Sequence, residues 1–381
     1  MVIHLPDGIG EYRLGSPGCF LPPAAPFRSR IAYAAAHVVP DAAADNTPGA
    51  PPKLDWDRTL AFRHELWRWG FGVAEAMDTA QRGMGLDWPT AAELIRRSAA
   101  EARSAGARIA VGVGTDQVTD PSLPQVMAAY REQLAVAEDA GATPILMASR
   151  ALAQVARSAD DYAEVYDSLL AEVSRPVILH WLGDAFDPQL AGYWGSADLD
   201  DAAETVLSLI SRHAKRIDGI KLSLLDADRE RSLRQRLPAG VRMYTGDDFH
   251  YSELIEGDGT GYSDALLGVF AAIAPAASHA LQALDNGDAA TYRKVLAPTV
   301  PLARQLFAAP TYHYKTGIVF LAWLNGHQDH FGMVNGAQHG RSRAHLTEVF
   351  RLADQAGLLR DPELAVHRMQ TFLAESATLR R

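Results

Sequence analysis

Cysteine is almost missing from this chain of 381 residues, in which Cys19 stands alone. One cysteine excludes an internal disulfide framework and fits a reducing compartment. The first fifteen residues lack the basic and apolar regions of an export signal. No uninterrupted apolar stretch reaches the roughly 18 residues that a membrane span needs. We therefore expect a cytoplasmic protein with no membrane partner.

Positive charge is also scarce, because 36 Lys and Arg face 46 Asp and Glu, for a formal net charge of −10. This balance argues against nucleic acid as a partner. A hydrophobic content of 48% and a charged content of 22% describe a well-cored globular protein. The spacings H-x-H and H-E-x-x-H do not occur, so neither a metal nor another cofactor is expected.

Short apolar runs recur along the first two thirds of the chain, and most are followed by a helical pattern. Runs without polar alternation are typical of strands covered on both faces, as in parallel sheets. The predicted strands are 30–37, 72–76, 108–113, 143–147, 177–180, 219–223, 242–245 and one within 261–269. Helical periodicity fills the intervening segments, for example 56–69 and 123–140.

Eight strands alternating with helices predict a (β/α)8 TIM barrel, with an open doubly wound sheet as the alternative. Beyond residue 272 the strand signal stops and helical patterns dominate. We therefore expect an N-terminal arm (1–29), a barrel (30–272) and a C-terminal helical extension (273–381). The Ala-, Pro- and Asp-rich segment 41–53 is predicted to be a mobile loop on the catalytic face.

Lys221 is a cation within an apolar strand run, 217–222. Burying an ammonium group costs free energy unless the group is paired or loses its proton. Lys221 is therefore predicted to pair with a buried carboxylate or to be a desolvated amine that forms Schiff bases. A lysine that reaches solvent from a strand end is the structural alternative.

Polar side chains gather where the predicted strands end, which in a TIM barrel is the catalytic face. They are Glu75, Asp78, Thr79, Thr115, Asp116, His180, Asp247, Asp248, His250 and Ser263, and Gly246 lies among them in the loop after the seventh strand. Any one rim carboxylate could be merely a helix N-cap, as we consider for Asp247 and Asp248. Their convergence on one face is what favours a functional site.

Five segments, in order, carry a resemblance to a known superfamily. They are GFGVAEAMDTAQRGMGL, RIAVGVGTDQVTD, AGATPILMAS, IDGIKLSLLDAD and MYTGDDFHYSEL. From about Arg30 to Ala272 the chain resembles the dihydrodipicolinate synthase and N-acetylneuraminate lyase superfamily of class I aldolases. The fourth segment is similar to that superfamily's G-[IV]-K-[DE]-[ST]-S-x-[DN] strand, so the resemblance implies that Lys221 is the Schiff-base lysine. It also implies a homo-oligomer, a dimer or tetramer.

Two departures from the superfamily pattern bear on the substrate. The fifth strand, which there ends Y-N-x-P with a proton-relaying tyrosine, ends here with His180, whose imidazole is suited to acid–base work near pH 7. The loop G-T-T-G-E, which there binds the substrate carboxylate, contains here Asp78 and Thr79. Asp78 would repel a pyruvate carboxylate, so a polyhydroxylated or keto-sugar substrate fits this rim better.

The leading hypothesis is thus a class I lyase, an aldolase or dehydratase, acting on a small keto acid or keto sugar. Lys221 and His180 are the expected catalytic residues. The expected substrate-binding residues are Asp78, Thr79, Gly246, Asp247, Asp248 and Ser263. Two alternatives stay open: a metal-dependent sugar isomerase or hydrolase using Glu75, Asp78, His180, Asp247 and His250, and a catalytically silent ligand-binding barrel.

Overall fold

The computed structural model describes residues 1–6 and 8–378 of the chain. Two compact units divide the chain, and each is described by itself. One consists of Arg30–Ala36 and Gly72–Leu267, and the other of Met1–Ser29, His37–Phe71 and Gly268–Arg381. The sequence analysis expected three parts, 1–29, 30–272 and 273–381. These two units follow different boundaries, because residues 37–71 belong to the same unit as the C-terminal helices. The three-part division stays a prediction.

Within the described residues, eight parallel strands close into a barrel. They are β3 (Ala32–Ala35), β4 (Gly72–Glu75), β5 (Ile109–Val113), β6 (Thr143–Leu146), β7 (Val177–Leu182), β8 (Ile217–Ser223), β9 (Arg242–Thr245) and β10 (Asp264–Leu267). Each strand pairs with the next in chain order, and β10 pairs with β3 to close the ring. The predicted barrel is confirmed, and the open sheet is wrong.

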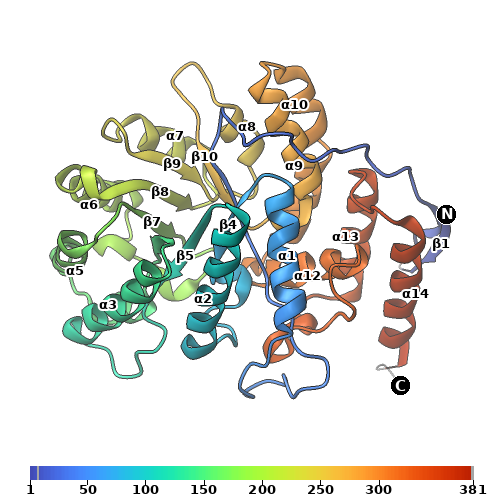
Figure 1. The fold of residues 1–381 in the computed structure, drawn as a ribbon, viewed down its shortest axis with the longest axis horizontal. Helices are drawn as coiled ribbons and strands as arrows, with labels where there is room; N and C mark the ends of the chain where they lie inside the picture. The colour runs from blue at the N-terminus through green and yellow to red at the C-terminus, as the bar shows by residue number, and fades with distance from the viewer. Residues whose placement is uncertain (7, 379–381) are drawn as a thin grey trace. The chain divides into compact units, whose positions relative to one another are not determined.

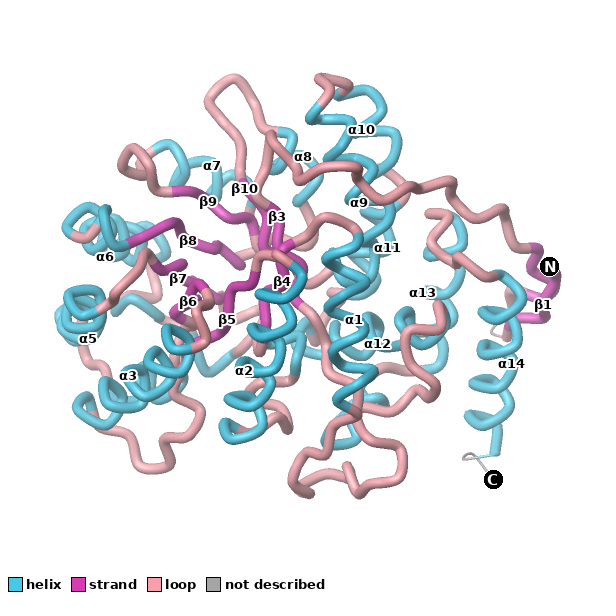
Figure 2. Tube along the Cα trace, viewed as in Figure 1, coloured by secondary structure: helices cyan, strands magenta, loops and turns pink. Residues whose placement is uncertain are grey.

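Helices surround these strands within the same unit (Figures 1 and 2). They are α2 (Trp88–Ala105), α3 (Leu123–Asp139), α4 (Arg150–Val155), α5 (Ala159–Glu172), α6 (Leu199–Arg212), α7 (Ala227–Gln235) and α8 (Tyr251–Glu256). Local sequence sets several helix starts: Asp87 and Ser122 cap the first backbone N–H groups of α2 and α3, and a proline follows each cap in the first turn.

Alternate strand residues fill the barrel interior. Tyr33, Ala74, Ala110, Ile145, Ile178, Tyr244 and Leu266 belong to one buried cluster. A Cβ atom at Gly219 would lie 2.7 Å from the Tyr244 ring, so β8 also faces the interior at Gly219. Because strand side chains alternate, the residues two positions further along, His180 on β7 and Lys221 on β8, face the same interior nearer the C-terminal ends of the strands.

The other unit is helical, apart from a short antiparallel hairpin of β1 (Val2–Leu5) and β2 (Gly10–Arg13) that the sequence analysis did not predict. Its helices are α1 (Trp56–Arg68), α9 (Phe270–Asp285), α10 (Ala289–Leu296), α11 (Thr299–Leu306), α12 (Tyr314–Leu324), α13 (Arg343–Gln355) and α14 (Pro362–Thr378). The predicted helical C-terminal region is confirmed. No helix in the described parts of the chain is long and apolar enough to cross a membrane.

Helix α12 is apolar on all sides and buried along its whole length. It packs among α9, α11, α13 and α14 of its own unit. The chain itself therefore covers this helix, which offers no apolar face to a second copy. A homo-oligomer stays a prediction, without support from this segment.

Candidate functional site

Lys221 lies on β8 with 8% of its surface exposed. Burial lowers the pKa of its amine below the ordinary 10.5, although the carboxylates of Asp248 and then Asp78 act to raise it. Two acids near a buried amine stabilise a positive charge there, while burial favours the neutral, nucleophilic form. The environment of Lys221 is thus compatible with both interpretations made from the sequence: a lysine paired with carboxylates, and a desolvated amine.

Gly246 follows β9 and lies against the lysine. A Cβ atom at this position would lie 2.7 Å from Lys221 Cε, 2.2 Å from Ser223 Oγ and 2.9 Å from the Leu222 carbonyl oxygen. Contacts this short do not occur between real Cβ atoms and their neighbours. Glycine is therefore needed here, because the side chains of Lys221 and Ser223 fill the space beside the backbone.

His180 on β7 pairs in register with Lys221 on β8, and 2% of its surface is exposed. Its Nε2 lies 3.2 Å from Ser223 Oγ. Burial, and then the nearby Lys221 cation, hold the pKa of His180 well below its ordinary 6.5. Near neutral pH the imidazole is thus uncharged, with one nitrogen able to donate a proton and the other able to accept one.

The two aspartates after β9 have different surroundings. Asp247 is buried and caps the turn that leads to α8, since its Oδ1 accepts from the backbone N–H of Phe249 at 2.8 Å and of His250 at 3.0 Å. Its Oδ2 lies 2.8 Å from His250 Nδ1. Asp248 is buried and acts electrostatically on Lys221. The capping interpretation therefore describes Asp247, whereas the carboxylate of Asp248 acts to raise the pKa of Lys221.

Asp78 and Thr79 begin a short 3-10 helix, Asp78–Ala80, after β4. Between β4 and this helix, the backbone at Ala76 has a φ of 52°, in the left-handed region. Asp78 is half-buried and borders a cavity of about 440 Å³ that His180 also lines. Thr79 is buried and, in the described part of the chain, is not among the lining residues.

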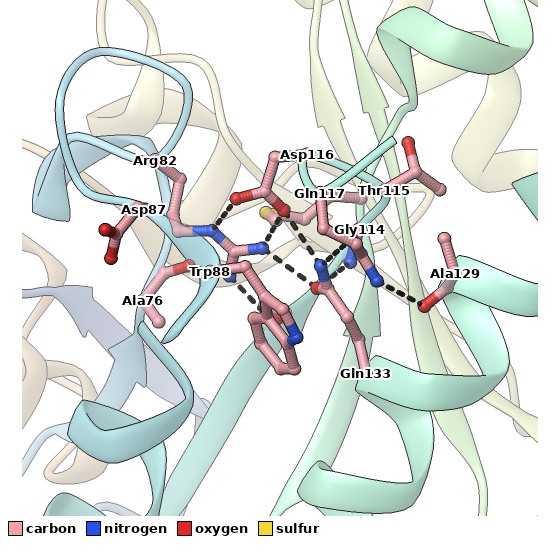
Figure 3. Close-up of polar contacts among 12 residues, drawn as sticks. Ala76, Arg82, Asp87, Trp88, Gly114, Thr115, Asp116, Gln117, Ala129 and Gln133 are labelled. Carbon is pink, nitrogen blue, oxygen red and sulfur yellow. Dashed lines mark hydrogen bonds and ion pairs between the residues drawn. The ribbon is translucent and has the colours of Figure 1, made fainter. Parts of the chain in front are cut away.

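Sequence reasoning missed Arg82, which organises the wall of this cavity (Figure 3). Its guanidinium forms an ion pair with Asp116, and its Nη2 donates to Gln133 Oε1 at 2.9 Å. Burial raises the pKa of Asp116, but Arg82 and Gln133 lower it by more, so it lies below its usual value. The Trp88 ring centroid lies 5.5 Å from the guanidinium carbon. Arg82 follows the rim residues Asp78 and Thr79 in the segment after β4, and this position was the signal available in the sequence.

Ser263 was expected at the catalytic end, but it precedes β10 and so lies at the start of that strand. Its hydroxyl donates to Glu230 Oε1 at 2.7 Å, and Thr245 Oγ1 donates to Glu230 Oε2 at 3.0 Å. Glu230 is a buried residue of α7. The structure thus brings Ser263 to Glu230, and no contact in the described residues supports its predicted role in substrate binding.

The five residues considered as metal ligands do not form one cluster. Within residues 1–6 and 8–378, no group of three or more His, Cys, Asp or Glu side chains is arranged to hold a metal ion. Glu75 accepts from the backbone N–H of Ala76 at 2.8 Å, and Asp247 and His250 contact each other. The metal-dependent alternative therefore lacks a ligand set in the described parts of the chain.

Comparisons with known proteins identify the fold. The family model described as "Protein of unknown function (DUF993)" matches residues 3–377, and no curated protein sequence matches this chain. Dihydrodipicolinate synthase from Aquifex aeolicus is similar in structure, with a TM-score of 0.65, 13% identity, and coverage of 86% of this chain and 98% of that one.

Two further solved structures of the same kind are similar to this chain. Dihydrodipicolinate synthase from Thermotoga maritima has a TM-score of 0.64 at 15% identity and covers 87% of this chain and 100% of its own. The 4-hydroxy-tetrahydrodipicolinate synthase from Methylacidiphilum fumariolicum SolV has a TM-score of 0.64 at 16% identity, covering 86% and 95%. At such identities the likeness shows the fold, and the resemblance predicted from the sequence is confirmed at that level.

Proposed function

We propose that this chain, which belongs to the DUF993 family of proteins of unknown function, is a lyase that forms a Schiff base through Lys221. Its substrate would be a small keto acid or keto sugar. The observation that carries the proposal is a lysine buried at the C-terminal end of a barrel strand, with its pKa lowered by burial. The dihydrodipicolinate synthase fold is consistent with a lyase.

The proposed reaction begins with the neutral amine of Lys221. The amine attacks the carbonyl carbon, a C–N bond forms, and the carbonyl oxygen leaves as water to give a protonated imine. The hydroxyl group on the carbon β to the imine carbon then loses its proton. The bond between the α and β carbons breaks and releases an aldehyde, and its electron pair forms the enamine as the imine π electrons move to nitrogen. Protonation of the resulting enamine carbon and hydrolysis by water release the product and restore the lysine.

His180 is the proposed proton carrier of these steps. Its imidazole neighbours Lys221 across two paired strands, and Ser223 Oγ lies 3.2 Å from its Nε2. A neutral imidazole held by one hydrogen bond can accept a proton at its second nitrogen and return it. Ser223 would therefore be a positioning residue that sets the orientation of the ring.

The carboxylates and the loop after β9 would hold the charged intermediate. Asp248 and Asp78 act on the Lys221 nitrogen and would stabilise the protonated imine. Gly246 leaves the space that the lysine side chain occupies, and Asp247 fixes the turn that carries Asp248. Thr79 is retained from the sequence analysis as a predicted substrate contact, whereas Ser263, whose hydroxyl donates to Glu230, is not.

Reductive trapping tests this proposal directly. The protein is incubated with keto acids and keto sugars in the presence of cyanoborohydride, and peptide mass spectrometry locates the adduct. We expect a stable adduct on Lys221 that Lys221→Ala abolishes. Lys215→Ala, which removes an exposed lysine just before β8, is the matched control and should label as the unaltered protein does. Adducts spread over exposed lysines but missing from Lys221 would refute the Schiff-base mechanism.

A further inference from the structure

The cavity beside Asp78 and His180 offers a polar site for the part of a substrate that does not react. Its volume of about 440 Å³ lies in the range of small-molecule sites, roughly 300–1,000 Å³. Arg82, Thr115, Ser149 and Arg150 contribute to its lining. Which substrate class it fits depends on whether these groups still have hydrogen-bonding capacity and net charge.

Arg82 has no N–H group left for a substrate carboxylate. A guanidinium carries five N–H donors. The acceptors are Asp116 Oδ2 for Nε, the carbonyl oxygens of Ala76 and Gly112 for Nη1, and Asp116 Oδ1 with Gln133 Oε1 for Nη2. The bidentate geometry that would bind a carboxylate is already used by the carboxylate of Asp116. Arg82 therefore shapes the wall and does not attract an anion.

The residues that line the cavity include more acidic than basic side chains. Arg150 donates from Nε to Asp187 Oδ2 at 2.5 Å, so a second carboxylate balances the second guanidinium. Asp78 also lines the cavity, and within the described residues neither guanidinium pairs with its carboxylate; the cation on which it acts is Lys221, which does not line the cavity itself. A substrate carboxylate in this space would be repelled by Asp78 and would meet guanidinium groups that already pair with Asp116 and Asp187.

In contrast, the lining contains groups that can form hydrogen bonds with the hydroxyl groups of a substrate. Thr115 Oγ1 lies 2.6 Å from Ser149 Oγ, and both buried hydroxyls belong to residues that line the cavity. His180 Nδ1 is buried and has no hydrogen-bond partner within residues 1–6 and 8–378. A carboxylate such as Asp78 accepts from hydroxyl donors. The lining thus offers acceptors and neutral donors to a substrate that carries several hydroxyl groups.

We infer that the carbonyl compound bound by Lys221 is a neutral polyhydroxylated ketone, such as a ketose, and not a 2-oxo acid. This inference rests on the proposed Schiff-base function and narrows its substrate class. The hydroxyl groups of such a ketone would bind Asp78, the Thr115–Ser149 pair and His180 Nδ1, while its carbonyl carbon reaches the lysine.

Matched pairs of carbonyl compounds test the inference. Hydroxyacetone and pyruvate differ at C1 by a hydroxymethyl group in place of a carboxylate, as do dihydroxyacetone and hydroxypyruvate, and D-fructose and 2-oxo-D-gluconate. The rate of reductive labelling of Lys221 is measured for each compound and divided by its rate with Nα-acetyl-lysine, which corrects for intrinsic reactivity. We expect the neutral member of each pair to label Lys221 at least about tenfold faster after this correction.

The possible outcomes separate the inference from the proposed function. Labelling of Lys221 that is equal for both members, or faster with the 2-oxo acids, would overturn the neutral-substrate inference while leaving the Schiff-base function standing. Lys221 left unlabelled by all six compounds would count against both. Preferential labelling by the neutral members supports both.

A charge-removal variant identifies the residue responsible. Asp78→Asn should reduce the preference for the neutral member, from about tenfold to about threefold or less, by raising the labelling rate of the 2-oxo acids. Asp184→Asn is the control, since Asp184 is an exposed carboxylate of the same unit that does not line the cavity. An unchanged preference in Asp78→Asn, or an equal loss in Asp184→Asn, would refute the role given to Asp78.

Discussion

Replacing Glu230 by glutamine should stabilise the protein at neutral and alkaline pH. Glu230 is a residue of α7 with 1% of its surface exposed, and two hydroxyl groups, of Thr245 and Ser263, donate to its carboxyl oxygens. Burial raises its pKa from the ordinary 4.5 to about 8; these hydrogen bonds act in the opposite direction, and Asp247 adds to the increase. The folded protein therefore keeps a proton that the unfolded chain has lost at neutral pH.

The sign and size of the effect follow from this difference in pKa. Between 4.5 and about 8 the folded state binds more protons than the unfolded state, so the free energy of unfolding falls as pH rises. Each pH unit within this range lowers the free energy of unfolding by up to about 1.4 kcal/mol. From about pH 5 to about pH 8 the loss due to Glu230 sums to about 3.5 kcal/mol. Glutamine has the same shape and no charge to bury, so Glu230→Gln removes this loss.

Urea unfolding of the two proteins at several pH values measures the effect. The difference in free energy of unfolding, variant minus unaltered protein, cancels the contributions of the buried histidines, which both proteins share. We expect this difference to grow by about 3.5 kcal/mol from about pH 5 to about pH 8. Glu164→Gln, at an exposed position of α5 in the same unit, is the control and should show no such growth.

A difference that stays constant with pH would refute this reasoning, because it would mean that Glu230 titrates alike in the folded and unfolded states. The outcome also bears on the site. Thr245 Oγ1, which donates to Glu230, accepts from the backbone N–H of Asp247 at 3.2 Å. Thr245 thus connects Glu230 to the loop that carries Gly246 and Asp248.

Three further predictions concern the lysine and its neighbours. His180→Phe should slow turnover by about 10²–10⁴-fold while Lys221 still labels with cyanoborohydride; normal turnover would make His180 a packing residue. Asp248→Asn removes the carboxylate that most raises the pKa of Lys221, so the pH profile of labelling should move to lower pH, and an unmoved profile would contradict that contact. Gly246→Ala places a Cβ atom 2.2 Å from Ser223 Oγ, so the free energy of unfolding should fall by about 1–3 kcal/mol. An unchanged urea midpoint of unfolding would contradict this prediction.

Much of the barrel could be predicted from the sequence because its signals are local. The apolar run that begins the predicted strand 177–180 marks a strand covered on both faces, and it lies within β7. The helix caps at Asp87 and Ser122 depend on residues within one turn. The hairpin of β1 and β2 was missed because each of its strands has only four residues, too few for a periodic pattern to be detected.

For the candidate site, the sequence by itself placed Lys221 within the strand run 217–222, where a buried cation must be paired or lose its proton. Only the tertiary structure decided which groups surround it. Arg82 and Asp116 are 34 residues apart, Glu230 and Ser263 are 33 apart, and the spacing of these residues does not predict their pairing. Charge balance depends on which side chains meet across strands and helices, because electrostatic energy falls with distance in space and not with separation along the chain.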